Sequence, residues 1–329
     1  MNLINFAKCF KQCRIILKGG YIMMIGQYPL TWVINDIFAI ILFFMCLFHA
    51  LRQKNYQNKV FELIMFVFGA GIFEHVGVFI THTYSYDPHR IMMAGAIPLA
   101  TLLIEAAIVY SSTILFEYLN MKSWMSIWVV GFLCVFQDFS IDPVYVHDRY
   151  MFNGVLSGQW NWAFKYHNSF FGIPYQNFTG WVYMTGFYVA LLYLGYWLAK
   201  KYSKRWLQTA TPFLAGLLLI IPLLAFGMFL IDGNSKLVPE LVKLVIACLI
   251  GIGLMIANWN KMKPIDIKRD KIIFTIPLLI QVYNLVIGFG LQLKQAYIPL
   301  IVCTIIEICY FGYLYRKGKR SARLSFNNN

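Results

Sequence analysis

Charged residues are scarce in this chain. They make up 13% of its 329 residues, whereas a soluble domain usually carries about 25%. Hydrophobic residues reach 60% and aromatic residues 18%, which excludes both a soluble domain and a disordered chain. The composition therefore predicts one all-α, polytopic membrane domain over residues 1–329.

Sequence signatures of several enzyme classes are also absent. The seven cysteines form no CxxC pair and no Cys/His cluster with zinc spacing, so we expect no zinc site and no disulfide scaffold. No glycine-rich fingerprint of a flavin or nicotinamide site is present. His75, His82 and His89 recur every seven residues, but the paired histidine boxes of membrane di-iron enzymes are missing. We therefore expect no cofactor and no metal.

Acidic residues are few, so the chain carries a formal net charge of +14. In a membrane protein such an excess marks cytoplasmic loops before it marks a polyanion site. We therefore expect membrane lipids and an apolar substrate as partners, and no nucleic acid. Most basic residues lie in five segments: 1–20, 52–59, 200–205, 261–271 and 316–323.

Long apolar runs predict about eight or nine spanning helices, each needing roughly 20 residues. The alternation of basic loops with loops poor in Lys and Arg places the C-terminus in the cytoplasm, in a multi-pass protein of the cytoplasmic membrane. Nine spans would put the basic N-terminus outside, so either residues 1–20 form an interfacial helix or one span is miscounted. The candidates are 30–51, 60–81, 91–118, 124–141, 178–199, 211–231, 240–259, 272–291 and 296–315.

Three carboxyl groups fall within or at the end of these apolar runs: Glu74, Glu105 and Asp138. Apolar surroundings favour the protonated form of a carboxyl, which is what a general acid needs. Charges inside spans are usually functional. Other acids near span ends or outside any motif are expected to be structural: Glu62, Glu117 and Glu307.

The stretch QDFSIDP places Asp138 and Asp142 four residues apart, on one face of a helix that we expect Pro143 to end. Such a pair has two interpretations. It either holds Mg²⁺ and a diphosphate, with Asp87 and Arg90 as weak supporting groups, or shares one proton between an acid and a base.

The segment 142–177 is too long for a plain connection and is rich in Trp, Tyr and Phe. We expect an extramembrane or re-entrant cap over an apolar cavity, where aromatic faces stabilise a carbocation. An aromatic belt at the membrane surface is the alternative.

Four motifs together resemble the carotenoid-biosynthesis hydratases, the family of the γ-carotene 1′-hydratases and the bisanhydrobacterioruberin hydratase. The resemblance covers roughly residues 60–200, and beyond it the chain matches only in hydrophobicity. Where the family has a glycine-rich turn, this chain has VFITHT with His82. The motifs are FEHVG at 73–77 followed by Tyr84 and Tyr86, DFSIDP at 138–143, WNW at 160–162 and GIPYQNFTGW at 172–181.

The resemblance implies addition of water to the terminal isopropylidene double bond of a carotenoid or related prenyl lipid. Protonation gives a tertiary cation that captures water, and no redox cofactor is required. The acid is then Asp138 or Glu74, with Asp142 as the base or as an orienting group, and Asn177 positions water. The remaining expected site residues are Tyr84, Tyr86, Glu105, Trp160, Trp162, Pro174, Phe178 and Trp181; Glu105 rests on its apolar surroundings alone.

Three other functions remain open from the sequence. A Mg²⁺-dependent intramembrane prenyltransferase and a lycopene cyclase are the enzyme alternatives. The non-enzymatic alternative is a lipid transporter or lipid-binding protein, although transporters often show inverted repeats and none is visible here.

Overall fold

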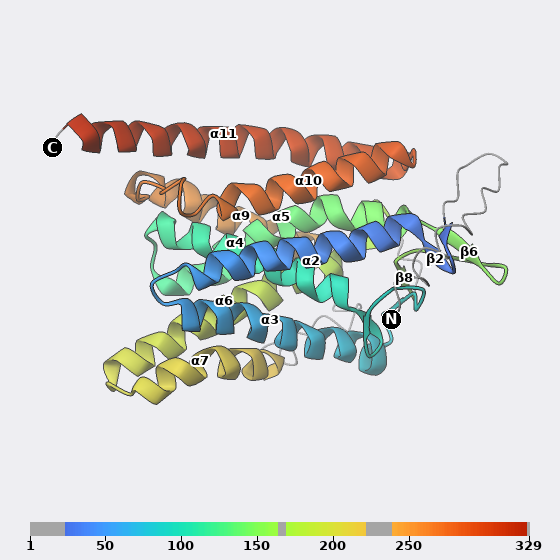
Figure 1. Cartoon of the computed structure of the whole chain (residues 1–329), viewed down its shortest axis with the longest axis horizontal. Helices are drawn as coiled ribbons and strands as arrows, with labels where there is room; N and C mark the ends of the chain where they lie inside the picture. The colour runs from blue at the N-terminus through green and yellow to red at the C-terminus, as the bar shows by residue number, and fades with distance from the viewer. Residues whose placement is uncertain (1–23, 164–168, 222–238, 328–329) are drawn as a thin grey trace, which may run out of the picture.

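The computed structural model describes residues 24–163, 169–221 and 239–327. Within these ranges, eight helical segments are long and apolar enough to cross a membrane, so the chain is an all-α, multi-pass membrane protein (Figure 1). The α-helices are α2 (Leu30–Leu51), α3 (Tyr56–Val76), α4 (Leu99–Leu119), α5 (Ser126–His147), α6 (Tyr175–Lys201), α7 (Arg205–Leu218), α9 (Glu240–Asn258), α10 (Ile272–Gly290) and α11 (Tyr297–Asn327). Short helical turns are η1 (Gly77–Thr81), η2 (Ser123–Met125), η3 (Trp259–Lys261) and η4 (Lys294–Ala296).

Helix α4 forms the centre of the bundle, and α2, α3, α5 and α10 pack around it. It is apolar on every side, which is typical of a fully surrounded helix, and nearly all its residues are buried. By contrast, α9 and α11 leave large apolar side chains such as Ile256 and Ile308 exposed. An apolar outer surface of this kind suits lipid rather than water.

Eight of the nine predicted spans are confirmed. The ninth, at 211–231, begins in α7 and continues into residues 222–238, which lie outside the described residues, as does the predicted interfacial segment 1–20. The third span begins at Leu99 instead of 91, because a hairpin precedes it.

In the described part of the chain, five pairs of short antiparallel strands lie at one end of the bundle (right in Figure 1), and we call them the hairpin cap. They are β1 (Met24–Ile25) with β2 (Tyr28–Pro29), β3 (Tyr84–Tyr86) with β8 (Trp160–Trp162), β4 (Met93–Ala94) with β5 (Ile97–Pro98), β6 (Tyr150–Phe152) with β7 (Val155–Ser157), and β9 (Ser169–Phe170) with β10 (Ile173–Pro174).

One local arrangement recurs three times in this cap. A tight hairpin turns on a glycine with positive φ, and a proline then leads directly into a helix. Proline suits this place because its fixed φ is compatible with the extended backbone before a helix. The glycines are Gly26, Gly95 and Gly172, and the prolines are Pro29, Pro98 and Pro174 at the N-caps of α2, α4 and α6.

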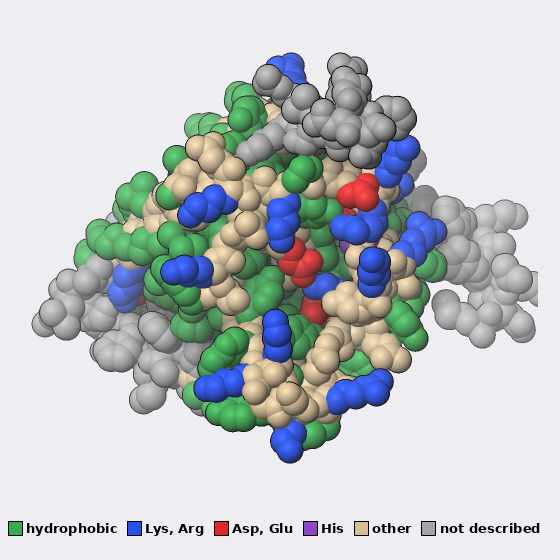
Figure 2. All heavy atoms as spheres, turned by 90° about the vertical axis from the view of Figure 1, so that its left-hand side faces the viewer, with side chains coloured by type: hydrophobic (Ala, Val, Ile, Leu, Met, Phe, Trp, Pro, Cys, Tyr) green, Lys and Arg blue, Asp and Glu red, His purple; other side chains and the backbone are tan. Residues whose placement is uncertain are grey.

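The opposite end of the bundle is basic. Figure 2 shows this end, with Lys and Arg side chains spread over it. They come from the end of α6 and from the turns that follow α2, α4 and α9, including Lys200, Arg52, Lys122 and Lys268. The hairpin cap and the basic end therefore mark the two sides of the membrane domain.

The expected end of a helix at Pro143 is wrong. Helix α5 continues through Pro143 to His147, because packed neighbouring helices tolerate the hydrogen bond that proline removes from a membrane helix. Asp138 and Asp142 consequently lie on one unbroken helix. The connection between α5 and α6 is 148–174 rather than 142–177.

Candidate functional site

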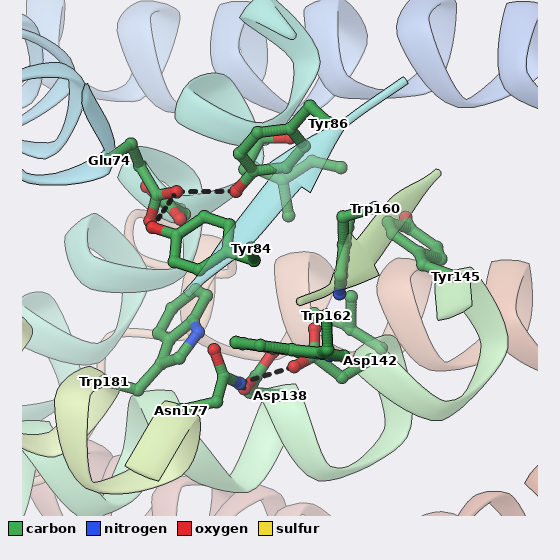
Figure 3. Close-up of a pocket in the computed structure, with 14 residues that line it drawn as sticks. Glu74, Tyr84, Tyr86, Asp138, Asp142, Tyr145, Trp160, Trp162, Asn177 and Trp181 are labelled. Atoms are coloured by element: carbon green, nitrogen blue, oxygen red, sulfur yellow. Dashed lines mark hydrogen bonds between the residues drawn. The ribbon is translucent and has the colours of Figure 1, made fainter. Parts of the chain in front are cut away.

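A small cavity lies where the hairpin cap meets the bundle (Figure 3). It leaves about 40 Å³ for the centres of water-sized molecules, and one water needs roughly 10–15 Å³ of such space. The cavity therefore has room for a few waters. Ten of the side chains predicted from the sequence line it: Glu74, Tyr84, Tyr86, Glu105, Asp138, Asp142, Trp160, Trp162, Asn177 and Trp181.

Pairing of β3 with β8 assembles the aromatic side of the cavity. Tyr84 lies opposite Trp162 and Tyr86 opposite Trp160, with ring centroids 5.2 and 5.9 Å apart. Alternate residues of a strand point to the same face, so all four rings face the cavity. Two motifs distant in sequence thus become one surface.

Glu74, in the last turn of α3, is held by both tyrosines. The Tyr84 hydroxyl donates to its Oε2 at 2.8 Å and the Tyr86 hydroxyl donates to the same oxygen at 2.6 Å. Burial and the adjacent Glu74 carboxyl raise the pKa of Tyr84 and of Tyr86 well above the usual value. Both tyrosines therefore remain O–H donors at physiological pH, and Glu74 Oε2 is an acceptor.

The turn that brings Tyr84 back to Glu74 stands where the family resemblance leads one to expect a glycine-rich turn. It is made by the π-helical turn η1, followed by His82 in the left-handed conformation with φ 50°. Gly77 is needed where η1 begins, since a Cβ at this position would overlap the Tyr84 hydroxyl.

Asp138 and Asp142 form the other acidic group of the cavity. Asn177, at the start of α6, donates its amide Nδ2 to Asp138 Oδ2 at 2.9 Å and also to Asp142 Oδ2. The two carboxyl groups also interact with each other, an arrangement in which one proton can serve both. Apart from Asp142, no described residue offers a donor to Asp138 Oδ1, which is buried.

Other buried polar atoms around the cavity also lack hydrogen-bond partners among the described residues. Glu105, on α4, is 2% exposed, and its Oε2 has no partner among the described residues. The indole nitrogens of Trp160 and Trp162 likewise find no acceptor in the described part of the chain. Buried polar groups normally have partners, so these atoms indicate a place for water or a ligand.

Two predicted site residues lie outside the cavity lining. Pro174 precedes α6 as its N-cap, and Phe178 is fully buried against Phe139, 4.8 Å between ring centroids. The sequence reasoning missed Thr101, Ile104, Ile141 and Tyr145. Helical spacing was the available signal, since Tyr145 follows Asp138 by seven residues and Thr101 precedes Glu105 by four.

A buried polar network joins the cap to α2 behind the cavity. Arg90 donates to Asp36 through Nε at 3.0 Å and through Nη2, and to Gln159 Oε1 through Nη1 at 2.7 Å. Asn35 bridges Gln159 and the Tyr145 hydroxyl. Arg90 is thus already paired and 4% exposed, which weakens it further as a supporting group for a diphosphate.

No histidine of the described residues lines the cavity with its acids. His75 binds the Gly71 carbonyl oxygen, and His89 stacks on Phe152 beside Asp87. The described residues contain no group of three His, Cys, Asp or Glu side chains placed to hold a metal ion.

Comparison with known families shows that residues 33–258 match the family model described as "Carotenoid biosynthesis protein". This range contains every residue that lines the cavity. No match was found among curated proteins or among solved structures.

Proposed function

The chain belongs to the carotenoid biosynthesis protein family, and from this premise we propose that it is a hydratase. It adds water to the terminal isopropylidene double bond of a long linear isoprenoid, giving a tertiary alcohol. The observation that carries the proposal is the Asp138–Asp142 pair, bridged by Asn177 and facing an aromatic cavity with room for only a few waters.

Asp138 acts first as the acid. It gives its proton to the CH carbon of the double bond, and the positive charge develops on the carbon that bears the two methyl groups. Asp138 is the better acid of the two candidates, because Glu74 Oε2 already accepts hydrogen bonds from two hydroxyls, whereas Asp138 Oδ1 accepts none from the described tyrosines or tryptophans. A positioned acid of this kind typically contributes about 10²–10⁴-fold to the rate.

The cation is stabilised by aromatic faces and by carboxylates. The rings of Trp160, Trp162 and Trp181 offer π-faces to a positive charge. Glu74, whose Oε2 is held by two tyrosine hydroxyls, supplies negative charge in a water-poor cavity, where such interactions are strong. A water in the cavity then bonds to the cation, and its spare proton passes to the carboxyl pair, with Asp142 as the base, so the acid is restored.

The site lies at the end of the bundle opposite the basic turns. Since Lys and Arg mark cytoplasmic loops, we place the basic end and the C-terminus in the cytoplasm and the cavity near the outer surface of the cell membrane. The isoprenoid then reaches the cavity from the bilayer and its terminal double bond enters beneath the hairpin cap.

The test is expression in hosts that make lycopene or other linear isoprenoids, followed by mass spectrometry. We expect a product heavier by one water, formed equally well when divalent metals are chelated. Asp138→Asn and Asp142→Asn should lower its formation by about 10²–10⁴-fold, whereas Glu117→Gln should not. Glu117 is a suitable control because it lies on α4 with Glu105 but pairs with Lys59 outside the cavity.

Three outcomes contradict the proposal. If the isoprenoids remain unchanged in several such hosts, the protein is not a hydratase of these substrates. A product of unchanged mass indicates proton-initiated cyclisation at the same acids, and strict Mg²⁺ dependence indicates prenyl transfer.

A further inference from the structure

A second, larger cavity lies on the other side of α5. It has a volume of about 840 Å³, within the range of roughly 300–1,000 Å³ found for ligand pockets. Helical periodicity turns Asp138 and Asp142 toward the first cavity and their neighbours on α5 toward the second. We call it the α11 groove, and its characteristic side chains are Phe136, Gln137, Met255, Trp259, Glu307 and Tyr310.

The α11 groove opens toward the lipid-facing surface. Ile256 on α9 and Ile305 on α11 line its rim and are 69% and 57% exposed. Both lie in segments long and apolar enough to span the membrane. A long apolar molecule can therefore enter sideways from the bilayer.

The floor of the groove is polar, although a purely apolar occupant such as an acyl chain would need no polar groups there. Gln137 donates its Nε2 to Glu307 Oε1, and both side chains belong to residues only 4% exposed. Their other oxygens, Gln137 Oε1 and Glu307 Oε2, have no partner among the described residues. Buried acceptors without donors are costly in apolar surroundings, so the occupant should bring an O–H or N–H group.

Tyr310 adds a third polar group without a partner to the groove, next to aromatic rings that suit a slender apolar chain. Tyr310 follows Glu307 by three residues on the same face of α11, and its buried hydroxyl is also without a partner in the described part of the chain. Its ring lies 6.1 Å from that of Trp259 and 5.2 Å from that of Phe311. A hydroxyl group matches this set, because it donates to the free oxygens and accepts from Tyr310.

We propose that the α11 groove binds a linear isoprenoid alcohol, with its hydroxyl between Glu307, Gln137 and Tyr310. That the alcohol is the product of hydration rests on the proposed function; the groove's preference for a hydroxyl does not. An ordinary phospholipid chain would fill the same volume without offering a donor to the floor.

The test compares two probes on the purified full-length protein in lipid nanodiscs. The probes are geranylgeraniol and its methyl ether, which keeps the chain but lacks the O–H. We expect the alcohol to bind about tenfold more tightly than the ether, the effect of one hydrogen bond to a buried polar group. Glu307→Leu should abolish this preference while leaving binding of the ether unchanged.

A pair of tryptophan variants locates the binding site without altering the polar floor. Ile306→Trp places a large ring on the lining of the groove and should weaken binding of the alcohol. Ile308→Trp is the matched control, because Ile308 is 63% exposed on the same helix and does not line the groove. Equal affinity for alcohol and ether, or equal binding by the two variants, would overturn the proposal.

Failure of the groove and failure of the hydratase are distinguishable. Asp138→Asn abolishes hydration in the proposed function but should leave the alcohol-to-ether preference intact. A protein that hydrates no isoprenoid yet keeps this preference retains the groove and loses the proposed reaction. If the protein hydrates normally but binds the alcohol and the ether equally, only the proposal for the groove fails.

Discussion

The hydroxyls of Tyr84 and Tyr86 hold Glu74 by two hydrogen bonds, which we call the clamp. Removal of the Tyr84 hydroxyl measures what the clamp contributes to the reaction. Tyr84→Phe keeps the ring that faces Trp162 but deletes one of the two donors to Glu74 Oε2. A hydrogen bond to a charged group is worth about 1.5–3 kcal/mol, and about 1.4 kcal/mol corresponds to tenfold. We therefore expect hydration to slow about 10- to 100-fold, and Tyr86→Phe to have a similar effect.

The assay is the initial rate of hydrated product in membranes that contain the isoprenoid, normalised to folded protein. Gly77→Ala should reproduce the effect of Tyr84→Phe, because its new Cβ occupies the space of the Tyr84 hydroxyl. Tyr150→Phe is the control: this tyrosine also belongs to the hairpin cap, but its hydroxyl bonds Thr31 at 2.8 Å outside the cavity. Its rate should equal that of the wild type.

A specific result would refute the reasoning. If both Phe variants hydrate at the wild-type rate while Asp138→Asn is inactive, Glu74 does not act on the cation and the clamp is only structural. If Tyr150→Phe slows the reaction as much as Tyr84→Phe, the effect reflects loosening of the hairpin cap rather than the charge on Glu74.

Three further predictions concern the hairpin cap and its attachment to the bundle. Arg90→Met leaves Asp36 buried without its cation and should destabilise the protein by about 3–5 kcal/mol, measured by chemical unfolding in detergent. Burial, partly offset by hydrogen bonds from Thr31 and Gln159, raises the pKa of Asp148 to about 6; the folded state thus retains the proton longer than the unfolded state. This contribution to stability is present below about pH 4 and lost as the pH rises through 6, so the stability of the wild type relative to Asp148→Asn should fall by about 2–3 kcal/mol across that interval. Gly95→Ala should lower the melting temperature, because φ is +65° there, which costs about 1–2 kcal/mol for other residues, and the Cβ would overlap the His75 ring.

The membrane architecture was largely predictable from the sequence. Apolar runs of about 20 residues carry a strong signal, because a bilayer leaves few other structures open to the backbone. The same signal misplaced the start of α4 at 91. Residues 93–98 are apolar as well, but Gly95 and Pro98 build a hairpin there.

The assembly of the site was predictable only in part. Burial of Glu74, Glu105 and Asp138 followed from their apolar surroundings, and the spacing of Asp138 and Asp142 placed them on one face. The pairing of β3 with β8 was not accessible, because three-residue strands are too short to show an alternating pattern. The sequence motifs therefore named the tyrosines and tryptophans without indicating that they face each other.

Local rules also failed where packing overrides them. Pro143 is a strong signal for a helix end, yet the helix continues because neighbouring helices enclose it. The recurring hairpin before α2, α4 and α6 was not predictable because its sequence signal is weak. Only a glycine and a proline are common to its three copies, as GQYP, GAIP and GIP, which is too little to stand out in a chain with 23 glycines.

The hairpin cap explains how a membrane protein keeps protonated carboxyl groups in a cavity with little room for water. Each of α3, α4, α5 and α6 brings a polar side chain to the same level, and the hairpin cap closes over them with the β3–β8 aromatic rings facing inward. Bulk water would quench a carbocation at once, whereas no water at all would prevent hydration. A cavity sized for a few waters, bounded by paired carboxyls on one side and tyrosine-held Glu74 on the other, meets both requirements. The fold thus limits the supply of water at the point where the proposed chemistry consumes it.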